Sequence, residues 1–393
     1  MTVRGNRWMD GATGVLTKPQ DSQPHLAARV VPVISARRSV ESFAFQFGRS
    51  YDSYLSTNPG RQRFWAKSGR GVVVYAPVGK YLNVVGGLLA DADEKESLLA
   101  EFVEYAHQRR LYISFYNIAD DEVLLFRRFG FQVTKWGEDA LIDLRQHTWQ
   151  GKAHAWVRRQ SNYCLRRGIS FSECFPNQLT TTEWNDIARE LEEISASRLT
   201  TKPQVSEMNF LDGRFEPQHL GRKRLFIARS ATSIEGFLIC NPCLNGTQWA
   251  LDTYHQRADG TRGTVTFLIH QTIQLMKAEG IERVSLCLIP TLRCRRVPGD
   301  SRLIRWGLNL SRHFTFIFDT AGLYHFKSRF RPRFEDRYVC VFPKATFGSV
   351  WAFTRLCGVL NLSLRKVLAG LWRRTRKWSR RSTQAKPELA PSD

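Results

Sequence analysis

The fold is decided by residues 248–289, which read QWALDTYHQRADGTRGTVTFLIHQTIQLMKAEGIERVSLCLI. Residues 248–254 predict a strand, and apolar residues at helical spacing predict a helix over 264–279 with Gly280 as its C-cap. A second strand is expected at 283–289. Strand, glycine-containing loop, helix and strand in this order indicate a mixed α/β domain.

A similar order of elements occurs earlier in the chain. Strands are predicted at 71–75 and 82–85, followed by a helix over 97–110 and a strand at 112–117. The remaining predicted helices cover 39–55, 122–130, 155–167 and 184–197, and the remaining predicted strands cover 131–135, 140–144, 169–174, 225–228 and 235–240. The two halves share this pattern but little sequence identity, so a duplicated α/β domain is inferred from element order alone.

These segments divide the chain into four parts. Residues 1–38 are polar and predict a flexible leader. One α/β domain is expected over 39–150 and a second over 151–345. Residues 346–393 are expected to form a basic amphipathic helix followed by a disordered tail.

The composition is globular but strongly basic. The chain has 58 Lys and Arg against 36 Asp and Glu, which gives a formal net charge of +22. Hydrophobic residues make up 42% and charged residues 24%, which excludes wholesale disorder and fibrous repeats. So large a positive charge favours nucleic-acid phosphates or anionic lipid headgroups as partners.

Targeting signals and cysteine usage point to the cytoplasm. No stretch approaches the roughly 18 consecutive apolar residues that span a bilayer, and the N-terminal segment lacks the apolar core of a secretory signal. The eight cysteines lack the density of a disulfide scaffold, so we expect them to be reduced and mostly buried. Cys240 and Cys243 form one C-x-x-C motif without a second pair, so zinc is not expected.

The loop at 257–263 is the first candidate site. Its Arg257, Gly260, Arg262 and Gly263 lie between a strand and a helix, where backbone N–H groups and the helix dipole favour an anion. The loop nearly fits the R-x-x-G-x-G/A motif by which acetyltransferases hold the coenzyme A pyrophosphate, although its last glycine comes one residue late. A glycine-punctuated surface turn is the alternative interpretation.

Other segments are more specific. Residues 124–131 (LLFRRFGF) are similar to the final helix-to-strand turn of the acetyltransferase fold, so a tandem acetyltransferase-like (GNAT-like) fold is expected. Residues 130–144 (GFQVTKWGEDALIDL), 157–171 (VRRQSNYCLRRGISF) and 323–338 (LYHFKSRFRPRFEDRY) also carry spaced motifs. Together with Trp249-x-x-Asp252 and Ser285-Leu286-x-Leu288-x-Pro290, these motifs resemble the phosphatidylglycerol lysyltransferase C-terminal domain family, the soluble synthase halves of the multiple peptide resistance factors.

The resemblance covers about residues 45–343 and implies a function. Such domains transfer an aminoacyl group from aminoacyl-tRNA to the glycerol hydroxyl of phosphatidylglycerol. An aminoacyl ester is already activated, so no cofactor, metal or covalent nucleophile is required. The protein must position two anionic substrates, help to remove the hydroxyl proton and stabilise the tetrahedral oxyanion.

The resemblance also indicates site residues. Asp252 matches an acidic residue at the reaction centre, and His255 stands where the family commonly has Arg. A neutral imidazole can act as a general base and a charged one can bind phosphate. Thr266 stands where the family tends to have an acid. Lys327 and Arg329 are expected to hold a phosphate of the lipid or of the tRNA acceptor end.

Several other residues leave alternatives open. Four arginines at helical spacing either line a tRNA-facing surface or form the solvated face of a cover helix: Arg158, Arg159, Arg166 and Arg167. Four further residues are expected to be structural, two acids bonding turn amides and two tyrosines packing in the first core: Glu138, Asp139, Tyr75 and Tyr116.

The C-terminal segment suggests membrane contact. Apolar residues recur every three or four positions over 347–371 beside two tryptophans, and ten Lys or Arg with no acid lie between 346 and 386. A basic amphipathic helix of this kind lies in a bilayer interface. The protein is therefore expected to be peripheral on the inner face of the cell membrane, bound through residues 347–381. A helix docked on the protein's own core and an RNA contact are the alternatives.

Two other functions stay open at this stage. The loop at 257–263 is compatible with an acyl-coenzyme A-dependent N-acyltransferase that acts on a lipid or small amine. The departures at His255 and Thr266 are compatible with a catalytically degenerate protein that only binds membrane and tRNA.

Overall fold

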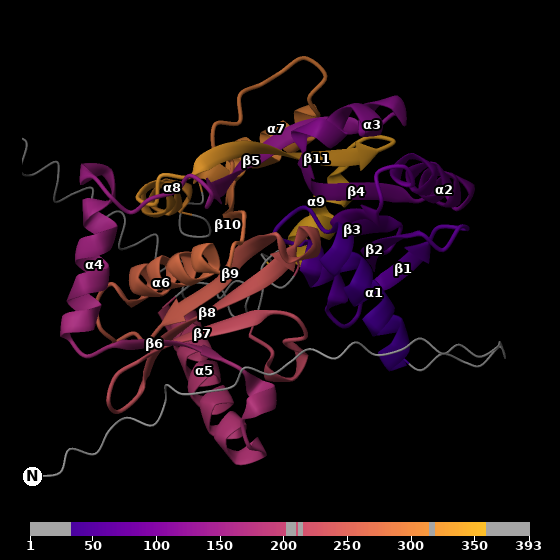
Figure 1. The fold of residues 1–393 in the computed structure, drawn as a ribbon. Helices are drawn as coiled ribbons and strands as arrows, with labels where there is room; N and C mark the ends of the chain where they lie inside the picture. Colours follow the sequence, from indigo (N-terminus) through magenta and orange to yellow (C-terminus); the bar gives the residue numbers. More distant parts are fainter. Residues whose placement is uncertain (1–32, 202–209, 211–214, 314–318, 359–393) are drawn as a thin grey trace, which may run out of the picture.

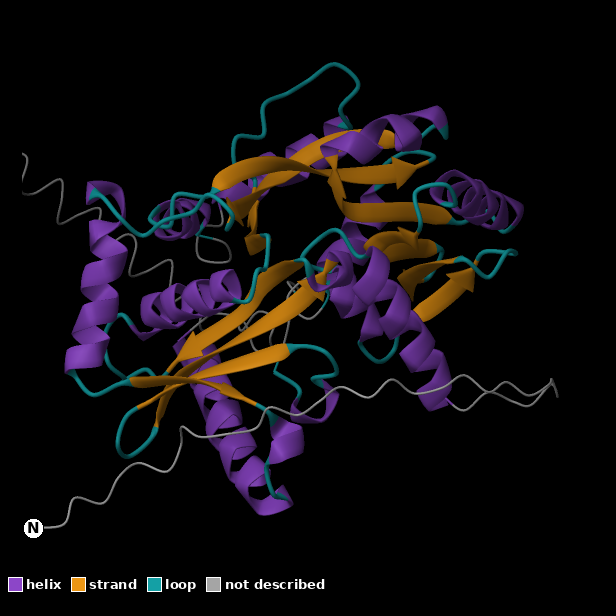
Figure 2. Ribbon diagram, viewed as in Figure 1, coloured by secondary structure: helices purple, strands orange, loops and turns teal. Residues whose placement is uncertain are grey.

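One mixed sheet runs through both halves of the chain. The structure, a computed structural model, describes residues 33–201, 210, 215–313 and 319–358 (Figure 1). In these residues eleven strands follow the order β1-β2-β3-β4-β11-β5-β10-β9-β8-β7-β6, with helices on both faces (Figure 2). The mixed α/β fold expected from the sequence is confirmed.

The first half follows the predicted order closely. Its elements are α1 (Val33–Phe47), β1 (Gln62–Trp65), β2 (Gly71–Val78), β3 (Tyr81–Ala90), α2 (Lys95–Gln108), β4 (Tyr112–Ala119), α3 (Val123–Arg128) and β5 (Gln132–Asp143). Helix α1 begins inside the segment predicted as a leader, and residues 1–32 lie outside the described part of the chain.

The second half adds elements that the sequence pattern did not indicate. Its elements are α4 (Ala155–Arg166), β6 (Ser170–Cys174), α5 (Thr181–Thr201), β7 (Arg224–Arg229), β8 (Ile234–Cys243), β9 (Gln248–Gln256), α6 (Thr264–Ala278), β10 (Arg283–Pro290), α7 (Arg302–His313), α8 (Thr320–Ser328), β11 (Arg333–Phe342) and α9 (Phe347–Leu356). Helices α7 and α8 were not predicted. The predicted helix over 347–371 is described only in its first turns.

Each half contains one parallel strand pair joined by a helix. Strands β3 and β4 are connected through α2, and their ladder ends at Phe115. Strands β9 and β10 are connected through α6, and their ladder ends at Ser285. Two residues further on, each half has a non-glycine residue with positive φ, Asn117 (58°) and Cys287 (67°). This repeated geometry is consistent with the inferred duplication.

The C-terminal strand crosses between the halves. Strand β11 pairs antiparallel with both β4 and β5, and β5 also pairs antiparallel with β10. Residues 333–342, which the sequence assigned to the second domain, therefore complete the sheet of the first. The sequence could not indicate this pairing. The position of a strand in a sheet depends on which other strands have unpaired edges, and the hydrophobic pattern of the strand itself does not specify them.

The hydrophobic core lies in layers on the two sheet faces. Tyr75 packs beside Phe102 of α2 in the first half, as predicted. Tyr116 is also buried, but it stacks on Phe353 of α9 at a centroid distance of 4.8 Å, in the layer shared by both halves. All eight cysteines are free thiols, and seven of them are buried, as expected. Across the described residues, no helix combines the length and apolarity that a bilayer crossing needs.

The two short strands predicted at 131–135 and 140–144 form the single strand β5. Its centre holds Gly137, Glu138 and Asp139, whose polarity interrupts the apolar pattern. A Cβ atom at Gly137 would lie 2.6 Å from the carbonyl oxygen of Ile289 and 2.9 Å from a methyl group of Leu288. Gly137 therefore allows β5 and β10 to approach closely.

We expect Gly137→Ala to lower the free energy of unfolding by about 1–3 kcal/mol, because the added methyl group meets a backbone carbonyl that cannot turn away. Denaturant midpoints measure the effect. Gly307→Ala in α7 is the control, since its Cβ would meet nothing within 4 Å. Equal midpoints for the two variants would contradict the close approach.

Candidate active site

Asp252 occupies a bulge at the junction of the two halves. The partners of Ile239 and Cys240 on β9 are Thr253 and Leu251, so Asp252 is the extra residue of the ladder. Its carboxylate accepts a hydrogen bond from the side-chain amide of Asn241 at 3.1 Å. That amide also donates to the backbone oxygen of Tyr51 in the first half, at 3.4 Å. The half-buried carboxylate is thus tied to both halves.

Lys327 contacts β10 just beyond Ser285, where the parallel pairing of β10 with β9 ends. The sequence predicted that Lys327 holds a substrate phosphate, and the structure places it on α8 with only 3% of the residue exposed. Its ammonium donates to the carbonyl oxygens of Cys287 (2.9 Å) and Leu288 (3.1 Å). Because burial of an ammonium is costly, these acceptors compensate for the lost hydration.

Cys287 connects the two candidate residues. Its thiol lies close to the Leu251 carbonyl oxygen at 3.4 Å. Burial raises the pKa of this thiol well above its usual value, the Asp252 carboxylate raises it further, and Lys327 lowers it. Asp252 and Lys327, 75 residues apart in sequence, therefore both lie in the electrostatic surroundings of one thiol. The raised pKa keeps that thiol protonated and excludes it as a ready nucleophile.

His255 has a different environment. Its ring is 4% exposed and lies against Phe237, and its Nδ1 is 3.2 Å from the hydroxyl of Ser195 on α5. These contacts are those of a packed side chain that holds β9 against α5. The catalytic role suggested for His255 stays a prediction.

The loop after β9 is filled by the protein's own side chains. The Glu235 carboxylate accepts from the backbone N–H of Thr261 at 2.6 Å, and the Glu235 backbone carbonyl accepts from the backbone N–H of Arg257 at 2.9 Å. A Cβ atom at Gly260 would lie 3.0 Å from the same carboxylate. A negative charge thus already occupies the place where the sequence suggested an external anion.

Helix α4 covers the other end of this loop. Gly263, with φ of 93°, is the N-cap of α6, and a Cβ atom there would lie 2.9 Å from the Gln160 side chain. The Cys164 sulfur contacts the carbonyl oxygen of Arg262 at 3.7 Å. Thr266, the departure noted in the sequence, is buried in the first turn of α6. The loop residues are therefore well placed to support α6 and α4.

Arg329 lies at the C-terminal end of α8. One of its terminal nitrogens is 2.9 Å from Nε2 of His325, and its guanidinium lies over the ring of Trp156 at 5.3 Å. Trp156 belongs to α4, so Arg329 links the helix that carries Lys327 to the arginine-rich helix.

The acids of β5 form ion pairs. The sequence predicted that Glu138 and Asp139 bond turn amides, but this prediction was wrong. Asp139 is fully buried and accepts from the Ser285 hydroxyl (2.6 Å) and from Arg337 (3.1 Å). Glu138 pairs with Lys135 at 2.7 Å and also with Arg293. Strands β5, β10 and β11 and the turn after β10 supply these groups, so no local motif could indicate the pairing.

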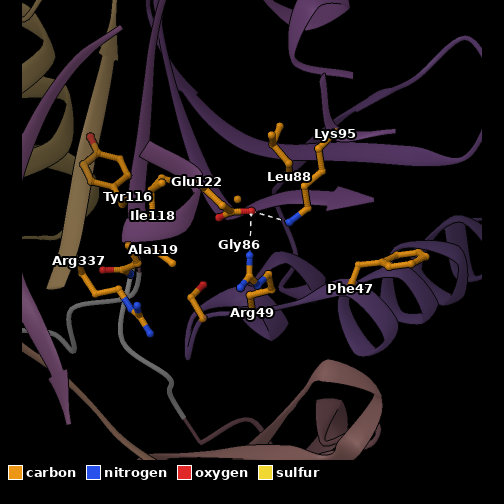
Figure 3. Close-up of a pocket in the computed structure, with 13 residues that line it drawn as sticks. Phe47, Arg49, Gly86, Leu88, Lys95, Tyr116, Ile118, Ala119, Glu122 and Arg337 are labelled. Atoms are coloured by element: carbon orange, nitrogen blue, oxygen red, sulfur yellow. Dashed lines mark hydrogen bonds and ion pairs between the residues drawn. The ribbon is translucent and has the colours of Figure 1, made fainter. Parts of the chain in front are cut away.

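The corresponding place in the first half has other residues. Two residues beyond the end of each parallel ladder, β9 has Asp252 but β3 has Gly86. A pocket opens there, with Glu122 between Lys95 and Arg49 (Figure 3). Strand β3 thus offers no carboxylate at the position where β9 offers Asp252, and the Gly86 N–H instead donates to Asp52 at 3.4 Å.

Sequence reasoning missed several neighbours of Asp252 and Lys327. Asn241 lies inside the C-x-x-C motif and does not stand out by spacing, whereas Ser285 opens the resembling segment 285–290 but was given no role there. Arg337 belongs to the resembling segment 323–338, which was the available signal. Only the sheet order brings these three residues to one place.

Comparisons with known proteins agree with this architecture. The sequence model of the family "Phosphatidylglycerol lysyltransferase, C-terminal" matches residues 43–341. The phosphatidylglycerol lysyltransferase of Bacillus subtilis is 24% identical over 320 residues, which cover 81% of this chain and 36% of that protein. The Staphylococcus aureus (strain MSSA476) enzyme of that name is 23% identical over 310 residues, covering 79% and 36%. The chain thus spans about a third of the length of these relatives.

Two solved structures share the fold. The C-terminal domain of a putative lysylphosphatidylglycerol synthetase from Agrobacterium fabrum is 23% identical with a TM-score of 0.66, covering 80% of this chain and 93% of that one. L-PGS from Bacillus licheniformis is 22% identical with a TM-score of 0.69, covering 81% and 95%. The predicted tandem acetyltransferase-like fold is confirmed, and the chain belongs to the phosphatidylglycerol lysyltransferase C-terminal family.

Proposed function

We propose that this chain is an aminoacyltransferase, which moves an aminoacyl group from aminoacyl-tRNA to a headgroup hydroxyl of phosphatidylglycerol or a related anionic lipid. The observation that carries the proposal is the placement of the Asp252 carboxylate and the Lys327 ammonium where β9 and β10 separate. The names of the curated relatives support the lipid acceptor.

The reaction exchanges one ester for another. The lipid hydroxyl oxygen bonds to the aminoacyl carbonyl carbon, the bond to the terminal ribose oxygen of the tRNA breaks, and that oxygen takes up a proton. Asp252 orients the attacking hydroxyl or the donor's α-ammonium and is placed to accept a proton. Lys327 supplies positive charge for the developing oxyanion. His255 keeps β9 in place, and Arg329 is placed for a substrate phosphate.

A basic surface on α4 supports the tRNA donor. Arg159, Arg166 and Arg167 are exposed on this helix, whereas Arg158 is partly buried and donates to the carbonyl oxygen of Gly151 at 2.9 Å. Exposed arginines that track along one helix are typical of phosphate contacts. Arg329 at the end of α8 contacts Trp156 on α4, so this basic surface adjoins α8, the helix that carries Lys327.

Exposed aromatic side chains on α9 and α7 support membrane contact. On α9, Phe353 and Leu356 pack inward, while Phe347 (75% exposed) and Trp351 (47%) face outward. Helix α7 packs beside α9 and exposes Trp306 (55%). Some of the apolar residues that the sequence assigned to a membrane-binding helix therefore pack in the core. The exposed rings of Phe347, Trp351 and Trp306 are the proposed bilayer contact. The predicted contact over 359–381 lies outside the described residues.

We expect Asp252→Asn and Lys327→Met to lower kcat/KM for aminoacyl transfer by about a hundredfold or more, because each removes a charge from the reaction centre. Mass spectrometry of lipids, from expressing cells and from vesicles supplied with aminoacyl-tRNA, measures the product. The controls are Asp186→Asn on α5 and Lys80→Met, which remove exposed charges elsewhere.

A new mass equal to a phospholipid plus one aminoacyl residue supports the proposal. If expression leaves the lipids unchanged and purified protein gives no product, the chain is a binding protein without this activity. If product forms but Asp252→Asn matches its control, the reaction occurs elsewhere in the protein.

The rival donor, an acyl-coenzyme A, is tested by thermal stability. Glu235 already occupies the Thr261 amide, so we expect millimolar coenzyme A to leave the Tm unchanged, whereas tRNA at low salt raises it. Scanning fluorimetry with each ligand gives the comparison. A rise in Tm that saturates with coenzyme A would favour the N-acyltransferase instead.

The membrane proposal is tested with liposomes of phosphatidylglycerol. Replacing Phe347 and Trp351 together with serine should weaken binding on the order of tenfold, equivalent to about 1.4 kcal/mol, because both exposed rings leave the interface. Co-sedimentation measures the partition coefficient. Leu165→Ser, an exposed leucine on α4, is the control. Unchanged binding by the double variant would remove α9 from the interface.

A further inference from the structure

We infer that Ser285 and Asp139 are positioning residues for Lys327, which they act on through the backbone turn at Cys287. The inference rests on the proposed function for its kinetic consequences. It concerns two fully buried side chains, and it assigns them the task of holding the ammonium in place.

The link is a continuous chain of hydrogen bonds. The Ser285 hydroxyl donates to Asp139 at 2.6 Å and accepts from the backbone N–H of Cys287 at 2.8 Å. The carbonyl of Cys287 then accepts from Lys327 at 2.9 Å. Arg337 closes the other end by donating to Asp139 at 3.1 Å. The backbone N–H of Cys287 is thus bound by the Ser285 hydroxyl, and the backbone carbonyl of Cys287 by the Lys327 ammonium.

The backbone at this point needs support. Cys287 has a φ of 67°, in the left-handed region that is unfavourable for a residue with a Cβ atom. Ser285 pairs with Leu141 and Leu288 pairs with Asp139, so β10 has one residue more than β5 between these pairs. This bulge takes Cys287 out of the ladder and leaves its N–H and carbonyl groups for Ser285 and Lys327.

The first half shows that the turn itself does not require the hydroxyl. Asn117 adopts a φ of 58° at the equivalent position, and Phe115 stands where the second half has Ser285. The pair of Ser285 with Asp139 of β5 is therefore specific to the turn at Cys287, where Lys327 binds. Its cost, a buried carboxylate, is offset by Arg337 from β11.

The test compares Ser285→Ala, Ser285→Thr and Asp139→Asn with the buried control Ser114→Ala in β4. We expect Ser285→Ala to lower kcat at least tenfold, with KM for lipid and tRNA changed less than twofold. Ser285→Thr keeps the hydroxyl and should recover most of kcat. Asp139→Asn should shift the alkaline limb of the kcat–pH profile, because the ammonium is held differently.

A second measurement does not depend on activity. Acetic anhydride labelling of Lys327, followed by mass spectrometry across pH, reports the accessibility and protonation of the ammonium. Ser285→Ala should label at least fivefold faster than wild type, whereas Ser285→Thr and Ser114→Ala should label at the wild-type rate. A Tm below the labelling temperature would identify a variant that does not fold. If Ser285→Ala is such a variant, Ser285→Thr alone is compared with wild type, and the inference then requires that it keeps the wild-type kcat and labelling rate.

The outcomes separate the two proposals. Wild-type kcat and labelling in folded Ser285→Ala overturn the positioning role, even if transfer activity is present. Faster labelling of Lys327 in Ser285→Ala, in a protein that makes no aminoacyl lipid, supports the positioning role and contradicts the proposed function. Equal losses in Ser285→Thr and Ser285→Ala also overturn the inference, since the hydroxyl would then be irrelevant.

Discussion

Strands β9 and β10 separate after Ser285, and the backbone groups exposed by that separation must find new partners. A buried N–H or carbonyl without a hydrogen bond is costly, so the end of a parallel ladder inside a core requires side chains to replace it. Here the ammonium of Lys327 takes two carbonyls of β10, and the hydroxyl of Ser285 takes an N–H group. The same requirement that stabilises the sheet therefore places a positive charge beside the Asp252 bulge.

The distribution of charge follows a related logic. The chain carries a net charge of +22, yet several acids are buried near the junction of the halves. Asp139 is neutralised by Arg337, whereas burial raises the pKa of Asp52 despite hydrogen bonds from Ser50 and Gly86. Among the arginines and lysines that the structure describes, only Arg305, Lys327 and Arg337 are buried. A positive exterior attracts polyanionic substrates, and acids retained inside remain available for positioning.

The two halves share a framework but differ in what fills it. Both have a parallel pair joined by a helix and a left-handed residue two positions beyond the ladder. The first half fills the equivalent positions with Gly86, Phe115 and Asn117 and contributes structure: a slot for β11, a carbonyl of Tyr51 for Asn241, and the ring of Tyr116 for α9. The second half has Asp252, Ser285 and Cys287 at these positions, which are the groups of the proposed active site.

The sequence by itself determined the order of most elements and the family resemblance, and it singled out Asp252 and Lys327 as candidate site residues. These properties are local, because strand and helix periodicity and short motifs involve residues that are close in the chain. Tertiary structure alone decided that β11 lies between β4 and β5, that Lys327 is buried, that His255 packs on α5, and that Ser285, Asp139 and Arg337 form one chain of bonds. Each of these depends on which strands become neighbours across gaps of up to about two hundred residues, and sheet neighbours are chosen by the packing of the whole molecule rather than by any segment.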